Sequence, residues 1–91
     1  MTGMEGHSVI SSDVLARYAA DAAAEVPGVH TKQRRGARVS GGEVEVHLVV
    51  DYGADIPHVA AEVQRAVVDY LKRMADLTPT AVNVIVDDVQ R

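Results

Sequence analysis

The chain has 91 residues, a formal net charge of −4, 47% hydrophobic residues and no cysteine. This length supports one domain with a single modest core, and the lack of thiols excludes disulfides, thiolate nucleophiles and thiolate metal sites. The acidic balance disfavours general binding to the phosphates of nucleic acids. Because the sequence shows neither a signal peptide nor an apolar run of membrane-spanning length, we expect a soluble, cytoplasmic protein.

The first predicted element is a helix that follows a flexible start at residues 1–7. Ser11 and Ser12 are good N-cap residues, and apolar residues then recur at helical spacing. Pro27 and Gly28 end this helix, because a residue before proline avoids the helical region and glycine tolerates a reversed backbone.

A short strand is predicted over residues 29–33, a loop or loose hairpin end over 34–42 and a longer strand over 43–52. The longer strand alternates apolar and polar residues, a pattern typical of a strand with one buried face. Its apolar face is formed by Val44, Val46, Leu48 and Val50.

A long amphipathic helix is predicted from residues 55–57, where proline fits the first turn, to residues 77–79. A last strand follows over residues 82–87. The expected domain spans residues 8–89, with residues 90–91 as a tail.

The predicted order is therefore helix, strand, strand, helix, strand. The first two strands are expected to pair as an antiparallel hairpin, and the helical crossover requires the second and third strands to run parallel. Both helices then cover one face of a three-stranded mixed sheet, which gives a two-layer α+β domain. The order of the strands across the sheet is left open.

The junction between the second strand and the second helix is the most distinctive segment. Gly53 allows a turn that bulkier residues disfavour, and Pro57 starts the helix just after Asp55 with a preset φ. Tyr52 has two interpretations: its ring caps the edge of the core, or its hydroxyl faces a partner.

Several segments, taken in order, resemble the alkaline shock protein family, bacterial proteins associated with cell-envelope stress. The matching segments are Ile10-Ser11 followed by Val14, EVPGV at 25–29, VHLVVDYGADIP at 46–57, VAAEVQ at 59–64 and VNVIV at 82–86. The resemblance implies no catalytic residues. It implies self-association and binding to membrane-anchored partner proteins at the cytoplasmic side of the envelope. The chain lacks the long glycine-rich insertion that many relatives carry between the first two strands.

A basic cluster stands out in this acidic chain, because four cations lie within seven residues of a glycine-containing loop. They are Lys32, Arg34, Arg35 and Arg38. Such a cluster can contact anionic lipid headgroups, at about 1 kcal/mol per cation, or an acidic patch on a partner. The alternative is a solvated hairpin end.

The histidines lack the spacing of a metal motif, although His30 and His47 are candidates to face each other across the hairpin. Carboxylates are also expected on the polar face of the sheet. They are Glu43, Glu45, Asp51, Asp87 and Asp88. Two interpretations of these carboxylates are a divalent-cation site and a solvated face that discourages aggregation; we favour the second and expect no cofactor.

Val49 and Ile85 are apolar residues on the sheet face that is otherwise polar. Contiguous exposed apolar surface usually marks an interface, so we expect these residues to contribute to a homo-oligomer contact. Scattered surface valines are the alternative.

These observations predict a non-enzymatic structural or interaction domain, because no nucleophile and base are paired. It is expected to self-associate and to bind a protein partner at the inner face of the cell membrane, with peripheral membrane association and no span. The alternative function is a small nucleic-acid-binding domain, since the order of elements is similar to that of KH-like folds.

Overall fold

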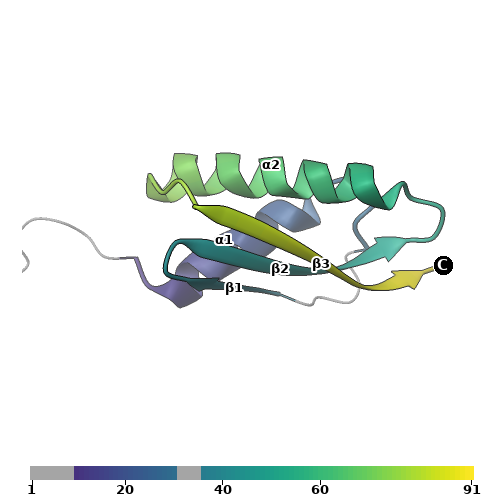
Figure 1. The fold of residues 1–91 in the computed structure, drawn as a ribbon, viewed down its shortest axis with the longest axis horizontal. Helices are drawn as coiled ribbons and strands as arrows, with labels where there is room; N and C mark the ends of the chain where they lie inside the picture. The colour runs from purple at the N-terminus through teal and green to yellow at the C-terminus, as the bar shows by residue number, and fades with distance from the viewer. Residues whose placement is uncertain (1–9, 31–35) are drawn as a thin grey trace, which may run out of the picture.

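The computed structural model describes residues 10–30 and 36–91, which form a two-layer α+β domain (Figure 1). Two helices lie on one face of a three-stranded sheet whose strand order is β1-β2-β3. The elements are α1 (Ser12–Ala24), β1 (Ala37–Ser40), β2 (Glu43–Asp51), α2 (Ile56–Ala75) and β3 (Ala81–Gln90). The predicted fold class and order of elements are confirmed, and β2 is the central strand.

The helix α1 begins at a capped N-terminus and presents small side chains to the rest of the domain. The Ser11 hydroxyl accepts a hydrogen bond from the Val14 amide at 3.2 Å, which satisfies one free N–H group of the first turn. The buried residues of the helix are Ala19, Ala22 and Ala23. Because alanine extends little from the backbone, α1 can lie close to α2 and to the sheet.

The β1–β2 hairpin differs from the prediction in its first strand. β1 occupies Ala37–Ser40, within the stretch predicted to be a loop or loose hairpin end, and pairs antiparallel with β2. Gly41 and Gly42, with φ values of 60° and 88°, make the two-residue turn that such a hairpin requires. This turn determines where the hairpin bends, and it leaves Val39 buried in the core.

The strand predicted over residues 29–33 is wrong in its described part, and residues 31–33 lie outside the described residues. An isolated antiparallel bridge joins Val29 to Val50. The His30 amide also donates to the Val49 carbonyl at 2.7 Å. The segment after α1 therefore pairs beside the last residues of β2, 49–51, which lie beyond the stretch that β1 pairs with.

β3 runs parallel to β2, as the helical crossover predicts, and it is longer than expected. A β-bulge between Leu48 and Val49 leaves Asp87 as an extra residue on β3, after which pairing resumes. Gln90, expected in a tail, is the last residue of β3.

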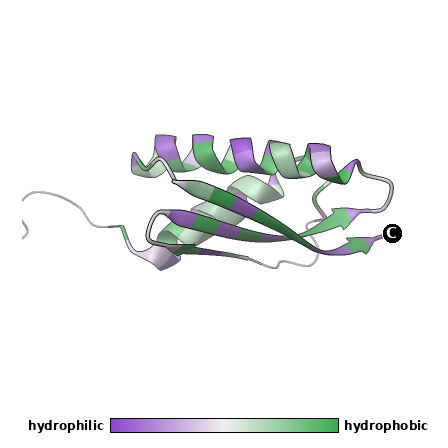
Figure 2. Ribbon diagram, viewed as in Figure 1, coloured by the Kyte–Doolittle hydropathy of each residue, from purple (hydrophilic) through white to green (hydrophobic). Residues whose placement is uncertain are grey.

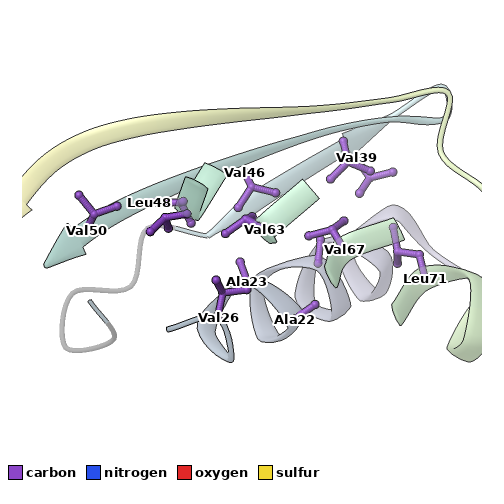
Figure 3. Close-up of a cluster of buried hydrophobic side chains, with 13 residues drawn as sticks. Ala22, Ala23, Val26, Val39, Val46, Leu48, Val50, Val63, Val67 and Leu71 are labelled. Carbon is purple, nitrogen blue, oxygen red and sulfur yellow. The ribbon is translucent and has the colours of Figure 1, made fainter. Parts of the chain in front are cut away.

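The core fills the space between the two helices and one face of the sheet (Figure 3). Hydrophilic residues recur along the outer side of α2 (Figure 2). Its buried side is Val59, Val63, Val67 and Leu71, and the buried face of β2 includes Val44, Val46, Leu48 and Val50. The predicted apolar faces of these two elements are confirmed, and their burial stabilises the fold at about 25 cal/mol per Å² of apolar area.

Candidate functional site

The sheet face opposite the helices, which we call the outer face, has no helix over it in the part of the chain that the structure describes. Side chains from alternate strand positions form this face. They include Arg38 from β1, Glu45, His47 and Val49 from β2, and Asn83, Ile85 and Asp87 from β3. The outer face is therefore mainly polar.

His47 lies between two carboxylates on the outer face, and we call Glu45, His47 and Asp87 the His47 cluster. The ring Nε2 lies 2.6 Å from Glu45 Oε2, and Nδ1 lies 3.1 Å from Asp87 Oδ2. Glu45 shares this face because it is two residues from His47 on the same strand. Asp87 is the bulge residue of β3, so the cluster joins the two parallel strands through their side chains.

The two carboxylates favour the charged form of His47. A neutral imidazole has one N–H donor, whereas the imidazolium can donate from both nitrogens. The hydrogen bond to Glu45, followed by that to Asp87, raises the pKa of His47 above its usual 6.5, and partial burial opposes this effect. The side chain is 33% exposed, so water weakens both pairs.

The stability that the His47 cluster contributes should therefore decrease at alkaline pH. Because folding raises the pKa of His47, this contribution is fully present below the unfolded value of 6.5 and is lost as pH rises through the folded pKa. Urea unfolding at about pH 6 and about pH 9 should show that wild type loses more stability than His47→Gln, by at most about 1 kcal/mol. Equal losses in the two proteins would contradict this role.

The carboxylates of the outer face do not converge on one point. Glu45 and Asp87 contact different nitrogens of one ring. Asp88 accepts from the Val89 amide at 2.8 Å. Within residues 10–30 and 36–91, no group of three or more potential ligands is placed to hold a metal ion.

A second histidine–carboxylate pair lines an open pocket of about 560 Å³ at the C-terminal ends of β2 and β3. His30 Nδ1 lies 2.9 Å from Asp51 Oδ1, and the Arg91 guanidinium lies 4.5 Å from the centre of the Tyr52 ring. Among the described residues, the pocket lining contains no serine, threonine or cysteine, and its one hydroxyl belongs to Tyr52, whose ring lies against Arg91.

The predicted meeting of His30 and His47 across the hairpin is wrong. His30 lies outside the hairpin and contacts Asp51, whereas His47 contacts Glu45 and Asp87. The sequence could not show this difference, because it depends on where the first strand begins.

The structure places one member of the predicted basic cluster. Arg38 is exposed on β1, directly opposite Glu45 of β2. Lys32, Arg34 and Arg35 lie outside the described residues, so the contact of this cluster with an anionic surface or partner stays a prediction.

The two apolar residues predicted on the outer face differ in exposure. Val49 is 1% exposed, so the expectation that it supplies open apolar surface is wrong. The bridge between Val29 and Val50 places His30 opposite Val49, which explains part of its burial. Ile85 is 36% exposed and remains available for a contact.

The junction after β2 has the local structure that its residues predict. Gly53 adopts a φ of +89°, and the Asp55 carboxylate accepts a hydrogen bond from the His58 amide at 3.3 Å. Pro57 lies in the first turn of α2. Tyr52 is 64% exposed, so its ring does not cap the core, and presentation of its hydroxyl to a partner stays a prediction.

One feature that the sequence interpretation missed is the outer edge of β3. β3 lies at the end of the sheet and pairs only with β2 among the described strands. Residues 81–86, which we call the β3 edge, contain no charge, no glycine and no proline. The uncharged run is visible in the sequence, but its place at a sheet edge requires the strand order.

Neither helix of the described residues combines the length and the apolar character needed to cross a membrane.

Comparison with known proteins agrees with the fold and with the predicted family. A solved structure of a MamM-CTD histidine-to-alanine variant aligns with a TM-score of 0.51 and 22% identity, covering 86% of this chain and 98% of that chain. At this identity the likeness shows the fold alone. No curated protein matches the chain.

A family model matches residues 34–91, from just before β1 to the end of the chain. The family is described as the alkaline shock protein 23 family, with a cell envelope-related function. The match covers more than half of the chain. It includes β2, the turn at Gly53 and α2, which carry most of the resemblance noted in the sequence. The chain therefore belongs to the alkaline shock protein 23 family, whose function is related to the cell envelope.

Proposed function

We propose that this protein is a non-enzymatic interaction domain that self-associates and binds a protein partner at the inner face of the cell envelope. The observation that carries the proposal is the open sheet. Both helices cover one face, and this leaves the outer face and the β3 edge accessible to another protein. The cell envelope-related function of the family supports the location.

The chemistry of the described residues supports binding rather than catalysis. Both ring nitrogens of His47 already contact carboxylates, so neither is free to act as a base without breaking an ion pair. The other paired histidine, His30, contacts Asp51, and the described residues that line its pocket include no serine, threonine or cysteine. A nucleophile and a base within hydrogen-bond reach are the minimum for covalent catalysis.

The basic cluster is the proposed contact with an anionic surface, either lipid headgroups or an acidic patch on the partner. Residues 1–42 carry a net charge of +1 (five Lys/Arg and four Asp/Glu), whereas residues 43–91 carry −5 (four Lys/Arg and nine Asp/Glu). Only residues 1–42 therefore carry a net positive charge, and Lys32, Arg34, Arg35 and Arg38 are concentrated there. This asymmetry would orient the domain towards a negative surface.

Replacing Arg34 and Arg35 with serine should weaken recruitment to the envelope and leave the fold intact. At about 1 kcal/mol per cation, the two changes should lower partition to the membrane fraction by about tenfold to thirtyfold. Fractionation of cells into soluble and membrane pools measures this. The matched control replaces Arg65 and Arg73 of α2 with serine, which removes the same charge elsewhere. Equal partition of both variants would contradict the proposed contact.

A further inference from the structure

Among the described residues, the β3 edge has little of the protection that exposed sheet edges usually have. An edge strand presents unpaired N–H and C=O groups, and natural proteins block such edges with charges, proline, short strands or a covering element. β3 has ten residues, and its residues 81–86 are uncharged. The Gln64 side chain donates to the Val82 carbonyl at 3.0 Å, which satisfies one group of this edge.

The opposite edge of the sheet is protected. β1 has only four residues, includes the exposed Arg38 and contacts α1. A short strand with a charged residue is a poor template for pairing. The two edges of the sheet thus differ, and β3 is the one suited to receive another strand.

Apolar surface on β3 also remains uncovered on both faces of the sheet. Its residues that face the helices, Val82, Val84 and Val86, are only half-buried. Their neighbours in β2 are 0% to 3% exposed, namely Val44, Val46 and Leu48. On the outer face, Ile85 is 36% exposed. A strand added beside β3 would cover both sets.

We infer that β3 pairs antiparallel with β3 of a second copy of this chain, across a two-fold axis at Ile85, so that two three-stranded sheets join into one. This inference rests on the proposed self-association and names the surface that performs it. The arrangement is self-complementary, because the same strand serves both copies, and it closes as a dimer.

The distribution of charge along β3 favours this register. With Ile85 on the axis, Asp87 lies opposite Asn83 of the second copy, and Asp88 lies opposite Val82. No carboxylate therefore faces a carboxylate, whereas a parallel arrangement in register would place each aspartate beside its own copy. The β-bulge at Asp87 also bends the strand, which would limit the new ladder to the uncharged stretch.

Because the chain has no cysteine, a single introduced cysteine tests this pairing directly. Two copies of Ile85→Cys would face each other with Cα atoms about 4.5–5.5 Å apart, within the range of a disulfide. Two copies of Val89→Cys would lie eight positions apart along the ladder, about 27 Å, although Val89 is equally exposed at 40%. Under mild oxidation, we expect Ile85→Cys to form a disulfide-linked dimer at least tenfold faster than Val89→Cys does. Equal rates would overturn the inference.

A charge-swap experiment gives an independent readout. Ile85→Glu and Ile85→Lys should each be monomeric by light scattering, because like charges meet at the axis. An equimolar mixture should recover the dimer, and circular dichroism checks that each variant is folded. If wild type is monomeric at high concentration, the proposed self-association itself fails. If wild type is dimeric and both folded variants stay dimeric, self-association holds and the β3 edge is the wrong surface.

Discussion

Leu71→Ala is expected to lower the free energy of unfolding by about 2–5 kcal/mol. Leu71 is 0% exposed and is among the largest fully buried side chains of the core. The other buried core residues are alanine, valine and leucine, whose short side chains cannot extend far into the cavity. A domain of this size has a total stability of about 5–14 kcal/mol, and the variant should therefore lose a large share of it.

Met74→Ala is the matched control for this change. Met74 lies three residues further along α2 and is 48% exposed, so its truncation removes a side chain of similar size and creates no closed cavity. We expect a loss below about 1 kcal/mol, partly offset by the better helix propensity of alanine. Guanidinium unfolding followed by circular dichroism compares the two variants. Similar losses would show that the core does not lie under the valine and leucine face of α2.

The sequence predicts α2 and β2 well because each has a complete hydrophobic period. The residues Val59, Val63, Val67 and Leu71 repeat every four positions, and the buried face of β2 repeats every two. Both patterns lie within a single element. Each prediction therefore requires only that the element buries one of its faces.

β1 was misplaced because its prediction depended on a turn rather than on a period. Val29 and the residues after it have strand propensity, but Gly41 and Gly42 determine where the chain reverses. Only the four residues before that turn can pair with the start of β2. Recognising the glycine pair as a hairpin turn would have placed β1 correctly.

The features of the candidate site were less predictable because they depend on residues distant in sequence. His47 and Asp87 are 40 positions apart and meet only because β2 and β3 are parallel neighbours with a bulge. Val49 looked exposed because strand alternation ignores the segment after α1, which pairs beside it. The β3 edge, likewise, becomes an edge only once the strand order is known.

The open sheet connects the family assignment to the proposed self-association. One face of the sheet packs against the core. The described residues of the other face and of the β3 edge do not form a nucleophile–base pair. A cell envelope-related domain that works by association needs such a surface, and a ten-residue edge strand whose residues 81–86 are uncharged would supply backbone hydrogen bonds together with apolar side chains. Arg38, the described member of the basic cluster, lies on β1 at the opposite edge of the sheet, so dimerisation through β3 need not compete with a contact made there.

Gly28→Ala is expected to destabilise the protein by about 2–5 kcal/mol, through two separate effects. Gly28 has a φ of +97°, a conformation that costs a residue with a Cβ atom about 1–2 kcal/mol. An added Cβ would also lie 2.7 Å from Cγ2 of the buried Val59, and overpacking of this kind costs about 1–3 kcal/mol. The carbonyl of Gly28 accepts from the Asp51 amide at 2.8 Å, so the backbone there cannot shift freely to relieve the contact.

Gly53→Ala separates the two effects, because Gly53 has a similar φ of +89° and no atom within 4 Å of an added Cβ. It should therefore show the backbone cost alone, about 1–2 kcal/mol in urea unfolding. Adding Val59→Ala to each glycine variant completes the comparison. The double change should cost less than the sum of the single changes at Gly28, where it removes the clash, and should be additive at Gly53. Additivity at both positions would mean that Gly28 is required only for its backbone conformation, and that its close approach to Val59 of α2 adds nothing to the cost.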